Sequence, residues 1–210
     1  MKFTKLSLVA ALAASTFATT AVASEIEVSA NVGVASDYVW RGMTQTNNGS
    51  AVQGGMDLAM GGFYLGAWTS NIANDTEVDG YAGYAGELAG IGYDVGYIRY
   101  GYLTDPSLSF NEAYVGLSKD FGVLSLGATY SMGQGTAPDD IAVDASIPVM
   151  DDYSLDLGWG DYDTYGTRYS AGLSKSFDKV DFGLVYSIYK ADAAGSENTD
   201  TLSVMASTGF

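Results

Sequence analysis

The chain ends in Thr201-Leu-Ser-Val-Met-Ala-Ser-Thr-Gly-Phe210, a stretch in which side chains of two kinds alternate up to the last residue. Leu202, Val204, Ala206, Thr208 and Phe210 share one parity, while the other parity carries Thr, Ser, Met and Gly. A period of two indicates a β-strand with one apolar face. Chain termini usually fray in polar residues, so a strand that ends on phenylalanine predicts an apolar environment for that side chain. A membrane would supply it.

The same alternation recurs along the whole chain. Residues of one parity are apolar, while those of the other are mainly Gly, Ser, Thr, Asn, Asp and Glu. The connections alternate between short and long, which is typical of barrels with short periplasmic turns and longer outer loops. Twelve segments are predicted as strands, at residues 26–36, 51–60, 63–70, 78–88, 91–101, 110–118, 123–132, 140–148, 153–160, 165–176, 180–190 and 200–210.

This pattern predicts an all-β fold, a transmembrane antiparallel up-and-down β-barrel of about 12 strands over residues 24–210, with no domain boundary and no plug. In a bilayer every backbone N–H and C=O must be satisfied within the protein, which leaves only helices and closed barrels. No stretch approaches the roughly 20 apolar residues of a spanning helix. A soluble β-sandwich would also alternate, but its outer face would carry many lysines.

The composition excludes several classes of protein. Acidic residues outnumber basic ones by 25 to 9, so nucleic acid is not expected as a partner. The 16 tyrosines suggest aromatic girdles at the membrane interfaces. The absence of cysteine and histidine excludes disulfides and every mechanism that pairs a nucleophile with histidine. Carboxylate pairs could still support hydrolysis, but acidic neighbours are common in so acidic a chain, and we expect neither an enzyme nor a catalytic residue.

The amino terminus has the pattern of an export signal. Lys2 and Lys5 precede an apolar run over residues 6–14, and small residues follow up to Ala23. This pattern predicts a cleaved signal peptide over residues 1–23. An exported barrel is expected in the bacterial outer membrane, with outer-membrane lipid around it. Homo-oligomers are left open, because lipid-facing and subunit-facing strips look alike in sequence.

Placing the apolar parity against lipid turns the polar parity toward the lumen. Glu27 and Asp144 belong to this inner side, together with most of the charged residues of the strands. Arg99 lies on the apolar parity, and we expect it beyond the hydrocarbon edge because a midplane arginine costs roughly 2 to 4 kcal/mol. The candidate pore-lining residues are Arg41, Asp57, Asp79, Glu87, Asp94, Glu112, Asp156, Arg168 and Asp181.

The most unusual string is Ser36-Asp-Tyr-Val-Trp-Arg-Gly-Met-Thr-Gln-Thr46, at the outer end of the first predicted strand. Two tyrosine- and glycine-rich stretches accompany it, at residues 81–88 and 93–97. Together with the signal peptide and the chain length, the string resembles the opening signature of the TorF family of outer-membrane porins, a Gcw_chp-type proteobacterial β-barrel. The resemblance implies a porin but does not specify the transported solute.

The parity of this string predicts where its side chains point. Tyr38 and Trp40 continue the apolar parity of the first strand, and we expect them in the outer aromatic belt. Asp37, Arg41 and Gln45 would then turn inward. Arg41 could bridge lumen carboxylates, either to neutralise crowded acids and fix the first loop or to form a constriction or ligand contact.

No cofactor or metal is expected. Asp75-x-Glu77-x-Asp79-Gly80 copies the first half of a calcium-binding loop, but Gly86 stands where the bidentate glutamate is required. Other acidic pairs, Asp139-Asp140 among them, are interpreted as solvated turns. The glycines at 133 and 135 are interpreted as a flexible loop without the third glycine of a dinucleotide site.

The function expected from these patterns is passive diffusion of small solutes through an outer-membrane porin. Carboxylates in the lumen predict a preference for cations. The alternative is a non-conducting barrel whose loops act as a receptor, an adhesin or a structural element. Phe210 resembles the carboxy-terminal aromatic signal by which the barrel-assembly machinery recognises its clients, although Thr208 stands where a second aromatic residue is commoner.

Overall fold

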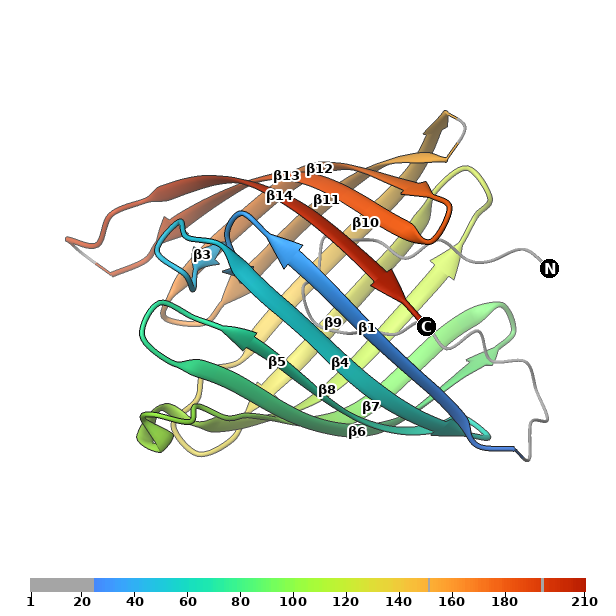
Figure 1. The fold of residues 1–210 in the computed structure, drawn as a ribbon, viewed down its shortest axis with the longest axis horizontal. Coiled ribbons are helices and arrows are strands. Elements are labelled where there is room, and N and C mark those ends of the chain that lie inside the picture. Colours follow the sequence, from blue (N-terminus) through green and yellow to red (C-terminus); the bar gives the residue numbers. More distant parts are fainter. Residues whose placement is uncertain (1–24, 151, 194) are drawn as a thin grey trace.

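The computed structural model describes residues 25–150, 152–193 and 195–210, so the predicted signal peptide lies outside the described residues. Within them, twelve strands close into one antiparallel barrel (Figure 1). Each predicted segment matches one barrel strand to within two residues at either end, which confirms the fold class. The barrel strands are β1 (Glu27–Ala35), β4 (Ala51–Met60), β5 (Phe63–Asn71), β6 (Thr76–Leu88), β7 (Ile91–Tyr100), β8 (Phe110–Asp120), β9 (Ser125–Gly133), β10 (Asp140–Met150), β11 (Tyr153–Tyr162), β12 (Gly166–Phe177), β13 (Val180–Ala191) and β14 (Thr199–Gly209).

The barrel closes between its first and last strands, which lie side by side in blue and red in Figure 1. In this register Asn31 lies opposite Gly209. Phe210 extends the pairing by one residue, because its N–H donates to the carbonyl of Ala30 over 2.9 Å and its carbonyl accepts from the Ala30 N–H over 2.8 Å. The last residue is therefore part of the hydrogen-bonded seam.

The two ends of the barrel differ in the length of their connections. We call them the turn end, with short connections such as 61–62 and 89–90, and the loop end, with longer ones such as 101–109 and 192–198. The loop end lies on the left of Figure 1 and the turn end on the right. A short 3-10 helix, η1 (Pro106–Leu108), lies in one of the loops.

The loops are tied to one another by Asp75. Its carboxylate accepts hydrogen bonds from the backbone N–H groups of Thr76, Thr104 and Asp105, at 2.6, 2.7 and 3.0 Å. Desolvation alone would raise the pKa of this carboxyl, but the three backbone donors lower it to about 2. The charge of Asp75 thus pins the β5–β6 connection to the β7–β8 connection.

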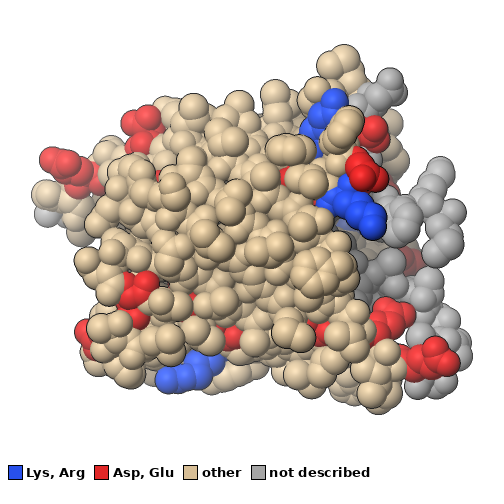
Figure 2. Space-filling view, viewed as in Figure 1, with Lys and Arg blue, Asp and Glu red and all other residues tan. Residues whose placement is uncertain are grey.

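The outer face of the barrel is apolar. Figure 2 shows a broad band without charged side chains across the middle of one face, with Lys, Arg, Asp and Glu gathered toward the two ends. Val34, Leu58 and Leu184 are among the large apolar residues exposed there. Arg99 is on this outer face, but it is the last residue but one of β7 and donates to Asn111 Oδ1 over 3.3 Å. Across the described residues, no helix is both long and apolar enough to span a bilayer.

The inner wall carries large aromatic side chains, including tyrosines that the sequence interpretation assigned to membrane girdles. Tyr64 and Trp68 of β5 are 9% and 8% exposed, because they point into the barrel. The Tyr64 ring lies over Gly83 and the Tyr114 ring over Gly96, where a Cβ would collide with the phenol. The girdle interpretation is therefore wrong for Tyr64 and Tyr114, since glycine on one strand makes room for tyrosine on its neighbour.

A segment between β1 and β4 folds into the barrel, contrary to the expectation that the lumen has no plug. Residues 36–50 contain two short strands, β2 (Val39–Trp40) and β3 (Met43–Thr44), which pair as a hairpin. Tyr38 is 2% exposed and packs edge-on against Trp68 of the inner wall, with ring centroids 5.3 Å apart. We call this segment the inner hairpin.

Candidate functional site

The motif residues hold the inner hairpin together by hydrogen bonds. Asp37 Oδ1 accepts from the hydroxyls of Thr44 and Thr46, each at 2.6 Å. The backbone carbonyl of Asp37 accepts from the hydroxyl of Ser203 on β14 over 2.8 Å. Ser36 bonds to Val204 through both its backbone N–H and its hydroxyl oxygen. The polar residues of the motif thus specify the hairpin and fasten it to the closing strand.

The turn of the hairpin consists of Arg41 and Gly42. Their φ angles are 49° and 82°, the two positive values of a type I′ turn, which is the turn that matches the twist of a two-residue β-hairpin. A Cβ on Gly42 would lie 3.0 Å from Arg168 Cβ and 3.3 Å from Tyr189 Cβ. Gly42 therefore allows both the turn and its close approach to the β12–β13 wall.

This close approach predicts a cost for a side chain at position 42. Gly42→Ala is expected to lower the free energy of unfolding by about 1 to 2 kcal/mol for the left-handed backbone, and by more if the wall cannot yield. Urea unfolding in detergent micelles, followed by tryptophan fluorescence, measures this loss. Gly122→Ala is the matched control, because its φ is also 82° and a Cβ there would meet nothing within 4 Å. Equal losses in the two variants would contradict the contact with the wall.

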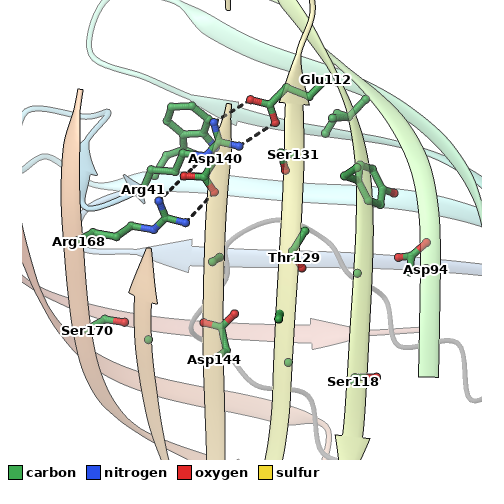
Figure 3. A pocket seen from close by; sticks show the side chains of 18 of the residues that line it. Arg41, Asp94, Glu112, Ser118, Thr129, Ser131, Asp140, Asp144, Arg168 and Ser170 are labelled. Atoms are coloured by element: carbon green, nitrogen blue, oxygen red, sulfur yellow. Dashed lines mark hydrogen bonds and ion pairs between the residues drawn. The ribbon is translucent and has the colours of Figure 1, made fainter. Parts of the chain in front are cut away.

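Arg41 lies at the centre of a row of alternating charges, which we call the charge ladder (Figure 3). Its Nη1 and Nη2 donate to the two carboxylate oxygens of Glu112, each over 2.7 Å. Its Nε is 3.4 Å from Asp140 Oδ1. Asp140 in turn accepts from Arg168 Nη1 and Nη2, at 2.5 and 2.9 Å. The ladder joins β8, the inner hairpin, β10 and β12, and its formal charges sum to zero.

The ion pairs of the charge ladder are buried, which increases their effect on stability. The side chains of Arg41, Glu112 and Asp140 are only 5%, 1% and 5% exposed. Bidentate arginine–carboxylate pairs are among the strongest hydrogen bonds in proteins, and removing one partner of a buried pair leaves the other charge uncompensated. The ladder is therefore a strong attachment of the inner hairpin to the wall.

Aromatic rings enclose the Arg41 guanidinium. Its Cζ lies 4.4 Å from the ring centroid of Trp40 and 4.5 Å from that of Tyr162, within cation–π range. Trp40 also packs edge-on against Tyr100, with centroids 5.6 Å apart. The expectation that Tyr38 and Trp40 lie in the outer belt is wrong, because the chain bends inward after β1 and the parity of that strand does not continue.

A cavity of about 840 Å³ runs along the inside of the barrel, beside the inner hairpin. One part of its wall is formed by small side chains of β8 to β12, among them Gly127, Thr129 and Ser170. Six of the nine predicted residues line it: Arg41, Asp79, Glu87, Asp94, Glu112 and Arg168.

The other three predicted residues are on the inner wall but are engaged in hydrogen bonds there. Asp57 accepts from the Tyr81 hydroxyl over 2.5 Å, and Asp181 from the Ser176 hydroxyl over 2.6 Å. Asp156, which is 1% exposed, accepts from two serine hydroxyls. No residue of these three is among those that line the cavity.

Sequence reasoning missed two groups of residues at this site. Asp140 joins both arginines, although the sequence interpretation assigned it to a solvated turn. Asp140 has the same parity as Asp144, which was predicted to face the lumen, so parity could have placed Asp140 inside the barrel. Tyr64, which donates to Asp94 Oδ1 over 2.6 Å and also hydrogen-bonds Tyr114, was likewise visible only through its parity.

The charge left over after pairing is negative. Six carboxylates that line the cavity have no ion pair within the described residues: Asp37, Asp79, Glu87, Asp94, Asp120 and Asp144. Lys119, at the turn end, is the one lysine in the lining. The two arginines of the cavity are both paired with carboxylates. A cavity that is neutral at the charge ladder and acidic elsewhere has a negative electrostatic potential.

A closed barrel with an apolar outer band and a polar interior defines an outer-membrane β-barrel. The chain belongs to a family described as bacterial protein of unknown function (Gcw_chp), whose model matches residues 19–204. A search of curated proteins found no match.

Solved structures with the same fold include two porins and an enzyme. The KdgM porin is 12% identical, with a TM-score of 0.64 over 87% of this chain and 99% of its own. The NanC porin is 13% identical, with a TM-score of 0.56 over 88% and 99%. Outer membrane phospholipase A from Escherichia coli is 13% identical, with a TM-score of 0.52 over 87% and 90%. At these identities the likeness establishes the fold alone.

Proposed function

We propose that this protein is a channel for passive diffusion of small solutes across the outer membrane. One observation carries the proposal, namely the cavity that extends from the inner hairpin at Gly42 to the turn-end residues Gly90 and Asp120. A path of this length inside a membrane barrel is what a diffusion channel requires. Discrete conductance steps of the refolded protein in a planar bilayer would support the channel, and a silent bilayer would refute it.

We propose further that the channel prefers cations. The reason is that six carboxylates along the cavity have no ion pair within the described residues, whereas both arginines are already neutralised and Lys119 is the one lysine in the lining. Under a potassium chloride gradient we expect a potassium-to-chloride permeability ratio above about 3 at low salt, falling as added salt screens the field. The double variant Asp94→Asn/Asp144→Asn should lower this ratio. A reversal potential that favours chloride would contradict the preference.

The solutes are expected to be neutral or cationic. A similar solved structure is the KdgM porin in complex with disordered oligogalacturonate, an acidic sugar polymer. In this chain an acidic ligand could pair with Arg41 or Arg168 only by displacing Glu112 or Asp140, and Lys119 is the one lysine in the lining. A liposome-swelling series with uncharged, cationic and anionic solutes of graded size tests this order of permeation, with anionic sugars expected to be slowest.

The inner hairpin favours a second candidate, a barrel that does not conduct and acts through its loops. The hairpin fills part of the lumen and is fixed by the buried charge ladder. Bilayer recordings separate the two candidates directly. The fold is also shared with a phospholipase, but a chain without histidine lacks the usual base for hydrolysis by serine.

Phe210 is proposed as an assembly signal for the barrel-assembly machinery. Two features support this role: its side chain is 79% exposed, and its backbone completes the β1–β14 seam. Membership of the narrower TorF family is likewise a proposal, which the motif at residues 36–46 supports.

A further inference from the structure

Part of the cavity lining comes from the inner hairpin and from β4 to β6. Asp37, Gln53, Trp68 and Asp79 all belong to this part of the lining, and we call them the acidic lobe. None of the four belongs to the charge ladder. The lobe therefore needs an explanation of its own.

Strand pairing brings these residues together. Trp68 lies directly opposite Asp79 in the β5–β6 register, and Gly55, two residues after Gln53, lies opposite Trp68 on the other side. Tyr38 of the inner hairpin packs edge-on against Trp68, and Asp37 directly precedes Tyr38 in the chain. The four residues thus come from the segment after β1 and from three consecutive strands, β4, β5 and β6, and all of them line the cavity.

Several buried polar atoms in and beside the acidic lobe have no hydrogen-bond partner among the described residues. They are the acceptors Asp37 Oδ2 and Gln53 Oε1, and a third acceptor, Glu77 Oε2, lies two residues before Asp79 on β6. Asp37 is 4% exposed and Asp79 is 2% exposed. Buried polar atoms are nearly always hydrogen-bonded, so two unpaired acceptors beside a second carboxylate suit a ligand that donates hydrogen bonds and carries positive charge.

We propose that the acidic lobe binds the ammonium group of a small primary amine. Its N–H groups would donate to Asp37 Oδ2 and Gln53 Oε1, the Asp79 carboxylate would supply charge, and Trp68 would supply an aromatic surface for the cation. A metal ion is a weaker match, since no group of three acidic residues is spaced to hold one in the described part of the chain. This site deepens the proposed function by naming a class of solute, and it rests on solutes reaching the lumen.

Titration calorimetry of the protein refolded in detergent micelles, at low salt, tests the site. Ethylammonium chloride is expected to bind saturably at one site, and tetramethylammonium chloride, which has charge but no N–H donor, at least about tenfold more weakly. Ethanol should not bind. Asp79→Asn should weaken ethylammonium binding at least about tenfold, while Asp144→Asn, which removes the same charge from another part of the cavity, should change it by less than about twofold. Gln53→Leu removes an acceptor without changing charge and should also weaken binding.

The outcomes separate this site from the channel itself. Equal weakening by Asp79→Asn and Asp144→Asn, or equal affinity for the two ammonium ions, would overturn the site. Binding would then be due only to the negative electrostatic potential of the whole cavity. Absence of saturable binding in a preparation that gives conductance steps would refute the site and not the channel. Saturable binding by a protein that leaves the bilayer silent would refute the channel and support the site.

Discussion

Arg41→Ala is expected to raise the single-channel conductance by about twofold or more and to increase the preference for cations. The change removes a large side chain from the cavity and turns the charge ladder from neutral to negative, since Glu112 and Asp140 lose their shared partner. It should also lower the free energy of unfolding by about 3 to 5 kcal/mol, the usual loss when one partner of a buried ion pair is removed. Planar-bilayer recordings at low salt measure the first two effects, and urea titration the third.

Arg99→Ala is the matched control for this variant. Arg99 lies on the outer face near the loop end and donates one long hydrogen bond to Asn111, at 3.3 Å. Its removal changes the net charge of the chain equally but leaves the cavity intact. Conductance and selectivity that stay unchanged in Arg41→Ala, together with a large loss of stability, would assign Arg41 a structural role alone.

Deletion of Phe210 is expected to reduce the yield of folded barrel in the outer membrane by about tenfold, while export and removal of the signal peptide continue. The last residue makes two backbone hydrogen bonds to Ala30 at the seam, and its ring is exposed on the outside of the barrel. Loss of these bonds weakens closure, because an unclosed sheet leaves unpaired backbone groups at its edges. The folded fraction is measured by the shift in electrophoretic mobility of unheated membrane samples.

Two controls separate the ring from the seam in that experiment. Phe210→Ala keeps the backbone bonds and removes the ring, so a loss as large as that of the deletion assigns the effect to recognition of the aromatic side chain. Phe121→Ala removes another exposed phenylalanine, in the turn between β8 and β9, and should not change the yield. Normal yield of the deletion variant would contradict any role in assembly.

The barrel itself could be predicted because its physical cause is local. A strand between lipid and a polar interior must alternate, so each of the twelve strands has the signal in its own residues. Parity also located the inner carboxylates and Arg168. It could have placed Tyr64 and Asp140 as well, but Tyr64 was interpreted by residue type, as part of a membrane girdle, and Asp140 by the acidic turn next to it.

The inner hairpin could not be predicted in the same way. Its strands are two residues long, so no alternation develops along them. Trp40 is also a residue type that is common at membrane interfaces. The Arg41-Gly42 pair suits a type I′ turn, which is a local signal for a hairpin. Those two residues do not indicate whether such a hairpin lies inside the barrel, above it or against lipid.

The sequence by itself determined that this protein is a closed antiparallel barrel whose first and last strands meet, because alternation and the demand for backbone hydrogen bonds act residue by residue along each strand. Only the tertiary structure decided what occupies the interior. Closure brings Arg41, Glu112, Asp140 and Arg168 together from distant parts of the chain. It also sets tyrosines against glycines along the wall of the cavity. Those contacts depend on strand register and on the inward bend after β1, which are properties of the closed sheet.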